Sequence, residues 1–244
     1  MGFQRFLGLA LLAPAALAQA PAPDLTGIWG PYRGGPGSDP KFAAPAATPL
    51  VLKPEYAKPY EERRAKEADA TKRGEQLANA SAQCLPYGVP TMMLVALYPV
   101  EIIQTQRQVT IISEAFSEVR RVYMNQPQAQ LDDVAPGYYG RSVGHWEGDT
   151  LTVNTVGIKT TVPGYRGMPH SEQMRVDEKL KMLSPDILHD QITITDPVVL
   201  EKPMTYTLAY KRFPKDYEMV EFVCDNNREY VDDKGVVRLK LKDR

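Results

Sequence analysis

Two of the three histidines in this chain lie where a loop meets a predicted strand, with an acidic residue close by. His170 stands in the run Pro169-His170-Ser171-Glu172. An imidazole that is oriented by a carboxylate or by backbone keeps one ring nitrogen free, and that nitrogen can accept a proton near neutral pH. We therefore predict that His170 is a general base oriented by Glu172. The alternative is a histidine that only caps its loop through hydrogen bonds.

The second histidine, His145, precedes a tight turn in the run Gly144-His145-Trp146-Glu147-Gly148-Asp149. Glu147, Gly148 and Asp149 have the composition of a hairpin turn, so we interpret the two acids as turn residues. Successive side chains of a strand point to opposite faces, so either His145 or Trp146 faces the interior. We predict that His145 is a complementary acid and that Trp146 helps to hold a substrate.

Glu178 is an acid in an apolar register. It shares one face of the predicted strand 173–182 with Met174, Val176, Leu180 and Met182, while the other face is polar. A charge in the interior is costly unless it is paired or hydrogen-bonded. Glu178 is therefore either a cavity carboxylate that works as an acid or base, or half of a buried ion pair.

Other residues are candidates for contacts with a ligand. Glu221 lies in a predicted strand whose two faces are both mostly apolar, and Arg121 is a possible partner for it inside a barrel. Tyrosine is plentiful, with thirteen in the chain, and a tyrosine combines a ring face with a hydroxyl group. We predict an aromatic, polycyclic or sugar-like ligand. The predicted substrate-binding residues are Trp146, Tyr165, Arg166, Tyr206, Glu221 and Arg121.

The two cysteines, Cys84 and Cys224, predict a disulfide, because an exported protein with an even cysteine count commonly oxidises them. Neither a CxxC nor an HExxH pattern is present, and every other ligand set would combine distant segments. We expect no metal. The sequence also lacks a P-loop and a dinucleotide fingerprint, so we expect no cofactor.

The first 18 residues have the features of a signal peptide: Arg5, an apolar run from Phe6 to Leu17, and small residues around Ala18. We expect cleavage near Ala18 and a periplasmic or secreted protein. The net charge is -1 with basic and acidic residues interspersed, which argues against a nucleic-acid partner. No later segment is apolar enough to predict insertion into a membrane.

The hydrophobic pattern divides the mature chain into two parts. Residues 19–97 contain a short strand at 24–29, an irregular arm rich in proline and glycine, and one surface helix from Pro54 to about Ala80. Pro59 is expected to break or delay that helix until Tyr60. Residues 98–244 alternate with a period of two and form a single globular unit with the preceding segment. The predicted strands span 101–106, 109–114, 118–124, 141–146, 149–156, 173–182, 187–195, 204–213, 218–224 and 236–241.

Adjacent strands with short turns predict an antiparallel meander, and closing the meander into a barrel removes its exposed edges. We therefore predict a mainly β protein with a lipocalin-like β-barrel of about eight to ten strands, one flanking helix and an irregular N-terminal arm.

Several motifs resemble those of a family of exported, mostly uncharacterised bacterial proteins. They are Asp24-Leu25-Thr26-Gly27-Ile28-Trp29, the turn with Cys84, Pro86, Gly88 and Pro90, His145-Trp146-Glu147-Gly148-Asp149-Thr150-Leu151, and Pro169-His170-Ser171-Glu172-Gln173. The resemblance implies an exported all-β protein and no particular reaction. The overall plan is also similar to lipocalin-type barrels, which include carriers and a few enzymes.

The leading functional prediction is a periplasmic enzyme that uses metal-independent acid–base chemistry on a small, partly hydrophobic molecule. A lyase, isomerase, cyclase or hydrolase fits, with His170 as base and His145 or Glu178 as acid. The first alternative is a non-catalytic, lipocalin-like carrier. The second is an envelope scaffold that makes its contacts through the arm from Gly34 to Pro49.

Overall fold

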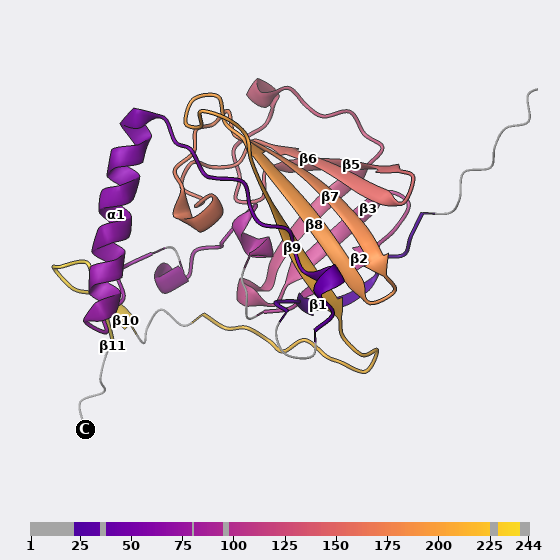
Figure 1. The fold of residues 1–244 in the computed structure, drawn as a ribbon, viewed down its shortest axis with the longest axis horizontal. Coiled ribbons are helices and arrows are strands. Elements are labelled where there is room, and N and C mark those ends of the chain that lie inside the picture. Colours follow the sequence, from indigo (N-terminus) through magenta and orange to yellow (C-terminus); the bar gives the residue numbers. More distant parts are fainter. Residues whose placement is uncertain (1–21, 35–37, 80, 95–97, 225–228, 240–244) are drawn as a thin grey trace, which may run out of the picture.

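The structure, a computed structural model, describes residues 22–34, 38–79, 81–94, 98–224 and 229–239. Nine strands close into a barrel in chain order, and β1 pairs with both β2 and β9 (Figure 1). This confirms the predicted mainly β barrel with one flanking helix. The barrel strands are β1 (Gly27–Pro31), β2 (Val100–Gln104), β3 (Gln108–Ser113), β4 (Glu118–Met124), β5 (Arg141–Glu147), β6 (Thr150–Val156), β7 (Arg175–Ser184), β8 (Ile187–Thr195) and β9 (Met204–Arg212).

One strand pair departs from the predicted antiparallel meander. β4 and β5 are parallel, with Val122 opposite Ser142 and Met124 opposite Gly144. Parallel neighbours need a crossover, and the long connection at 125–140 provides it. Gly144 permits the close approach, because a Cβ atom there would lie 2.9 Å from a methyl group of Val122. The other barrel pairs are antiparallel.

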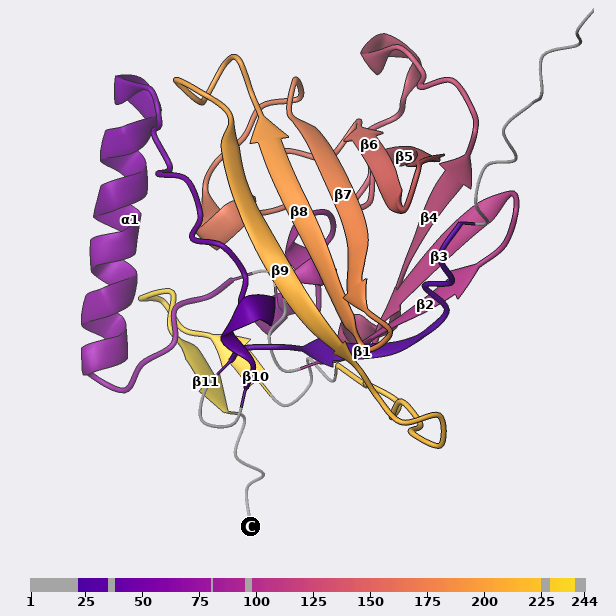
Figure 2. The same cartoon turned by 45° about the vertical axis from the view of Figure 1, so that its right-hand side comes forward.

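Of the last two predicted strands, the one at 236–241 is present as a shorter strand and the one at 218–224 is absent. Residues 218–224 form no strand. Instead, β10 (Glu229–Val231) and β11 (Val237–Leu239) form a separate two-stranded hairpin. This hairpin lies beside the segment that follows the helix, where Val237 donates to the carbonyl of Gln76 (Figure 2). The predicted signal peptide, residues 1–18, lies outside the described residues.

The helix α1 (Pro54–Lys72) stands outside the barrel, and Ala70 is its one buried residue (Figure 2). The prediction that Pro59 breaks or delays the helix is wrong. Pro59 is the sixth helical residue, so its ring removes a single hydrogen bond near an exposed end. The helix also ends before the predicted Ala80, because Gly74 adopts a φ of +71° just beyond it. Short 3-10 helices span Pro40–Phe42 (η1), Ser81–Gln83 (η2), Thr91–Met93 (η3), Ala115–Ser117 (η4), Leu131–Asp133 (η5) and Tyr165–Gly167 (η6).

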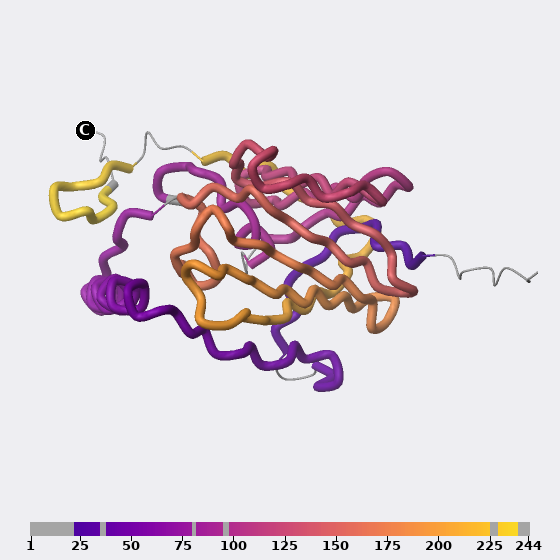
Figure 3. Tube along the Cα trace, turned by 90° about the horizontal axis from the view of Figure 1, so that it is seen from above, coloured from indigo at the N-terminus to yellow at the C-terminus, as the bar shows by residue number. Residues whose placement is uncertain are grey.

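The irregular arm runs along the outside of β8 and β9 (Figure 3). His189 of β8 contacts the carbonyl oxygen of Phe42 at 2.9 Å, and Thr48 donates its backbone N–H to Thr205 of β9. These contacts fix the arm against the wall of the barrel.

One end of the barrel is closed by Trp29 and Arg212. Trp29 is fully buried and donates its indole N–H to the carbonyl of Leu25. The guanidinium of Arg212 lies 4.1 Å from the centroid of the Trp29 ring, which is the geometry of a cation–π contact. Arg212 also donates to the carbonyl oxygens of Asp24, Thr26 and Pro185, so it joins β9 to the strand-entry loops at this end.

The predicted disulfide is present between Cys84 and Cys224, whose Cα atoms are 5.6 Å apart. It attaches the segment after β9 to the turn at 84–90. Buried Glu118 of β4 fixes the same turn, because its carboxylate accepts the backbone N–H groups of Tyr87 and Gly88. The turn is therefore held at both the disulfide and the barrel wall.

Candidate functional site

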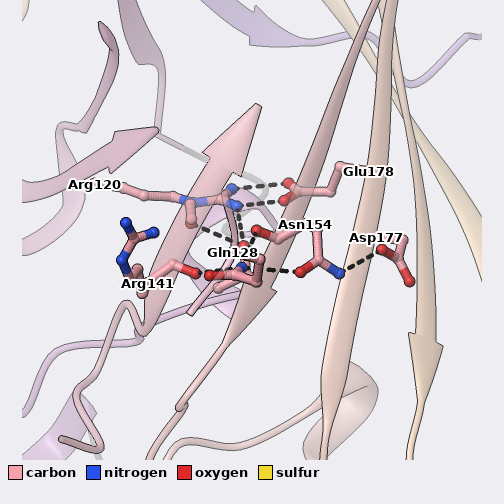
Figure 4. A network of polar contacts seen from close by, with 8 residues as sticks. Arg120, Gln128, Arg141, Asn154, Asp177 and Glu178 are labelled. Atoms are coloured by element: carbon pink, nitrogen blue, oxygen red, sulfur yellow. Dashed lines mark hydrogen bonds and ion pairs between the residues drawn. The ribbon is translucent and has the colours of Figure 1, made fainter. Parts of the chain in front are cut away.

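A buried ion pair crosses the barrel interior between β4 and β7. Arg120 Nη1 donates to Glu178 Oε1 at 2.8 Å, and its Nη2 also contacts the carboxylate (Figure 4). Both residues are 1 % exposed. Burial is the largest single effect on the pKa of Arg120 and lowers it, but the charge of Glu178, the hydrogen bonds to Glu178 and the nearby Asp190 and Tyr210 together raise it. The predicted inward position of Glu178 is confirmed, in the ion-paired form.

The strands between these two residues supply hydroxyl groups to the same guanidinium. Ser142 of β5 accepts from Arg120 Nε at 3.1 Å, and Thr155 of β6 accepts from Nη2 at 2.9 Å. The two hydroxyls also lie 2.8 Å apart. Arg120 thus makes four hydrogen bonds through its three side-chain nitrogen atoms, and these bonds hold its charge in one position.

Asp190 of β8 extends the polar groups beyond Glu178. It shares the inward face of β8 with Leu188 and Ile192 and is fully buried. Neither carboxyl oxygen has a hydrogen-bond partner within the described ranges. Burial, and then the negative charge of Glu178, raises the pKa of Asp190 well above its ordinary value, against the opposing charge of Arg120. Both effects favour the protonated form of Asp190, and an interaction with the Glu178 side chain adds to the shift.

Tyr206 of β9 lies beyond Asp190 and is the last of these buried polar side chains along the barrel wall. Its ring is 3 % exposed, and its hydroxyl also has no partner in the part of the chain that the structure describes. Burial, followed by the nearby carboxyl groups, raises the pKa of Tyr206, so the hydroxyl stays neutral and can donate and accept. Its neighbour Tyr210 differs, because that hydroxyl donates to the carbonyl of Met93 at 2.7 Å.

Six consecutive strands, β4 to β9, therefore each place at least one polar side chain inside the barrel. We call this set the polar belt. Its members are Arg120, Ser142, Thr155, Glu178, Asp190 and Tyr206. The half from Arg120 to Glu178 is saturated by internal contacts, while Asp190 and Tyr206 have unused polar atoms. A buried polar atom without a partner is costly, so the unused groups mark the place where an incoming polar atom gains most.

A loop covers Tyr206 from the end of the barrel opposite Arg212. The ring of Tyr165, in η6, stacks on the ring of Tyr206 with a centroid distance of 4.4 Å and an interplanar angle of 29°. Exposed Arg166 lies 5.2 Å from the other ring, that of Tyr165. From outside, α1 holds this loop, because Tyr60 and Arg63 donate to the carbonyls of Arg166 and Gly167. The predicted binding residues Tyr165 and Tyr206 are therefore in direct contact.

His170 is buried at the base of this loop and touches two backbone carbonyls. Its Nε2 lies 2.8 Å from the oxygen of Val162, and its Nδ1 lies 2.9 Å from that of Ser171. Glu172 is exposed and lines a different hollow, together with Ser171 and Gln173. The contacts of His170 are those of the loop-capping alternative, and its role as a base with Glu172 stays a prediction.

His145 and Trp146 take opposite faces of β5, as the alternation requires. His145 is exposed on the outer face, where Nε2 lies 3.0 Å from Glu147, and half-buried Trp146 packs against the interior core. His145 lines an outer groove of about 520 Å³ over β5 to β8, with Asn154, Asp177 and other polar residues. Asn154 joins Asp177 to Gln128 there (Figure 4). The structure therefore does not bring His145 together with His170 or with the carboxyl group of Glu178.

Arg121 and Glu221 are not in the interior. Both are exposed, and Arg121 points outward from β4. The predicted pairing requires the face of Val119, Arg121 and Tyr123 to point inward. The opposite register, with Glu118, Arg120, Val122 and Met124, is buried. Arg120 is accommodated by its ion pair with Glu178, and Glu118 by hydrogen bonds from the backbone N–H groups of Tyr87 and Gly88.

Sequence reasoning missed Arg120 and Asp190. Asp190 carries the same signal as Glu178, since Leu188, Ile192 and Ile194 share its face, and that test applied to β8 finds it. No such signal identifies Arg120, because each face of β4 carries one arginine.

Within the described ranges, no three His, Cys, Asp or Glu side chains are grouped so that they could hold a metal ion. None of the described helices combines the length and apolar character needed to span a membrane. No family model matches this chain, and no curated protein is significantly similar to it in sequence.

Proposed function

We propose that this protein binds a small, partly apolar molecule inside its barrel, against Asp190 and Tyr206, and acts as a lipocalin-like binding protein. The observation that carries the proposal is the unequal use of the polar belt: Arg120 and Glu178 satisfy each other, while Asp190 and Tyr206 keep unused polar atoms in an apolar wall. A few placed polar groups within an apolar enclosure are typical of small-molecule sites.

The proposal includes export to the periplasm or the exterior. The first 18 residues support it, and so does the Cys84–Cys224 disulfide, because disulfides form and persist in oxidising compartments. The motifs around Trp29, His145 and His170 support placement in the family of exported bacterial proteins that they resemble.

Acid–base catalysis is the second candidate, and one observation favours it. Two adjacent buried carboxyl groups have different environments: Glu178 is ion-paired with Arg120, while burial raises the pKa of Asp190. Carboxyl pairs whose protonation states are pushed apart are typical of acid–base sites. In this candidate Asp190 donates a proton to the bound molecule and Tyr206 orients it. His170 with Glu172 remains the proposed base, while His145, on the outer face of β5, takes no part.

The test of binding uses two neutral, apolar fluorescent probes, retinol and N-phenyl-1-naphthylamine. We expect saturable binding of at least one probe to the wild-type protein, with one site per chain. Tyr206→Phe should weaken that binding about tenfold, which corresponds to about 1.4 kcal/mol, because it removes a buried hydrogen-bonding group from the site.

Tyr210→Phe is the matched control. It removes the same atom from the same strand, but that hydroxyl already donates to Met93. We expect it to reduce stability by about 1 kcal/mol and to leave probe affinity within about twofold. Equal affinity of the wild type and Tyr206→Phe, or no binding of either probe, contradicts the proposal.

A further inference from the structure

The stacking contact between Tyr165 and Tyr206 indicates which chemical class of ligand the barrel site accepts. Tyr206 presents one ring face toward the end of the barrel, and the ring that covers it belongs to a loop and not to the barrel wall. Tyr165 is only half-buried, while Tyr206 is almost fully enclosed. The Tyr165 ring therefore covers the side of the polar belt on which Asp190 and Tyr206 have polar atoms without hydrogen-bond partners among the described residues.

The loop that carries Tyr165 is closed mainly by short-range contacts. Gly167 donates to Gly164, and Met168 donates to Tyr165, so the turn keeps its form as a unit. Arg166 has a φ of +52°, a left-handed conformation that costs a non-glycine residue of order 1 kcal/mol or more. The outer attachments come from α1, through Tyr60 and Arg63. Tyr165 belongs to this loop and not to a barrel strand, so a displacement of its ring from Tyr206 requires no change in the strand pairing.

The charges near this face restrict the chemistry of an occupant. The charges of Arg120 and Glu178 are paired with each other, and the raised pKa of Asp190 favours its neutral form. The enclosed site therefore has no spare charge to pair with an ionised ligand, and burying an unpaired ion is costly. A neutral hydroxyl or carbonyl group, by contrast, can exchange hydrogen bonds with the Tyr206 hydroxyl and the Asp190 carboxyl.

We infer that the face of Tyr206 is an aromatic subsite, filled by the Tyr165 ring in this structure, and that it takes neutral planar aromatic molecules bearing a hydroxyl or carbonyl group. The occupant replaces Tyr165 in the stack and brings its polar group to Tyr206 and Asp190. This inference rests on the proposed function and names the ligand class of the same site. Because Tyr165 competes for the subsite, its removal strengthens binding.

The experiment compares three probes of one ring size: 2-naphthol, which is neutral and hydroxylated, naphthalene, which has no polar group, and 2-naphthoate, which is an anion at pH 7. Dissociation constants are measured by the fluorescence of Trp29 and Trp146, with calorimetry as a second readout. For the wild-type protein we expect 2-naphthol to bind at least fivefold more tightly than either of the others. Tyr206→Phe should remove the advantage of 2-naphthol over naphthalene.

Tyr165→Ala is the deciding variant, and we expect it to bind 2-naphthol at least threefold more tightly than the wild type. Tyr165→Phe keeps the competing ring, so its affinity should stay near that of the wild type. Tyr138→Ala is the matched control, because Tyr138 is also half-buried and also has a cation over its ring, Lys159 at 4.9 Å, but stacks on no belt residue. It should leave the affinity unchanged. Circular dichroism spectra check that each variant is folded.

Three results overturn the inference: tighter binding of 2-naphthoate than of 2-naphthol, no gain in Tyr165→Ala, or an equal gain in Tyr138→Ala. The retinol titration separates this failure from failure of the proposed function. If retinol still binds and Tyr206→Phe weakens it, the barrel site stands and the aromatic subsite falls. If neither retinol nor 2-naphthol binds the folded protein, both fall.

Discussion

Arg120 and Glu178 reach each other across the barrel from β4 and β7, and their ion pair is closed to solvent. The guanidinium is further held by Ser142 and Thr155, so the pair cannot turn toward a ligand without losing several hydrogen bonds. The ion pair is therefore a fixed part of the polar belt. Asp190 and Tyr206 supply the polar atoms that can still form hydrogen bonds with a ligand.

Glu178→Gln should reduce the free energy of unfolding by about 3–5 kcal/mol, because it leaves the buried guanidinium of Arg120 without its counter-charge. Urea denaturation followed by fluorescence measures the change. Lys179→Gln, on the exposed side of the same strand, is the control and should stay within about 0.5 kcal/mol of the wild type. A loss below about 1 kcal/mol for Glu178→Gln would contradict the claim that Arg120 depends on Glu178 for its counter-charge.

Asp190→Asn should change how stability depends on pH. The folded-state pKa of Asp190 is raised, so the folded protein holds a proton that the unfolded chain releases above its ordinary value of about 4. Wild-type stability from this group is full below that pH and falls as the pH rises toward the folded-state pKa, by at most about 1.4 kcal/mol per pH unit.

Asparagine does not titrate, so the free energy of unfolding of the variant should rise relative to that of the wild type as the pH rises from about 4 to about 7. Denaturation curves at a series of pH values give the difference directly. Parallel pH profiles for the two proteins would mean that Asp190 is ionised in the folded state.

Removal of the disulfide, by Cys84→Ala together with Cys224→Ala, should cost about 5 kcal/mol of stability at most. The cysteines are 140 residues apart, and the chain-entropy model assigns such a long loop a large constraint on the unfolded state. Because the segment at 213–224 has no strand pairing, we expect proteolysis to cut it first in the double variant. A non-reducing mass measurement that finds two alkylatable thiols in the native protein would contradict the bridge.

The two histidines should respond differently to alanine. His170→Ala removes contacts to the carbonyls of Val162 and Ser171 in a buried position, so it should destabilise the protein by about 1–3 kcal/mol. His145→Ala is exposed and should change stability by less than about 0.5 kcal/mol. Thermal unfolding of both variants checks this contrast, which equal losses would refute.

The same two variants separate the carrier from the enzyme. A binding protein keeps its affinity for retinol within a few-fold in both. If a substrate is identified and His170→Ala binds it normally but loses at least a hundredfold in turnover, the base role predicted from sequence is correct.

Most barrel strands can be predicted from sequence alone, because apolar and polar residues alternate along each strand and indicate which side chains face inward. Glu118–Met124 and Ile187–Thr195 have the predicted bounds. The same alternation finds Glu178. It fails at β4, where the ion pair of Arg120 and the backbone hydrogen bonds of Glu118 stabilise the register that the sequence did not indicate. The energy that decides that register comes from partners on distant strands, which a local pattern does not contain.

Two further features depend on long-range contacts. The parallel pairing of β4 and β5 depends on the path of the connection at 125–140, which has no regular pattern in sequence. The segment at 218–224 alternates like a strand, yet the closed barrel leaves it no edge: β9 already pairs with β1 and β8. Its aromatic Phe222 packs on Tyr98 and Phe116 instead.

The most direct test of the central claim is infrared difference spectroscopy of the wild-type protein with and without retinol. The raised pKa of Asp190 favours its protonated form, and a protonated carboxyl group has a carbonyl stretch distinct from those of ionised carboxylates. We expect such a band in the wild-type protein, and its loss in Asp190→Asn assigns it to Asp190. We predict that retinol shifts this band, because its hydroxyl group contacts Asp190 in the barrel. Saturable binding of retinol with the Asp190 band unchanged would contradict the claim that the ligand lies against the polar belt.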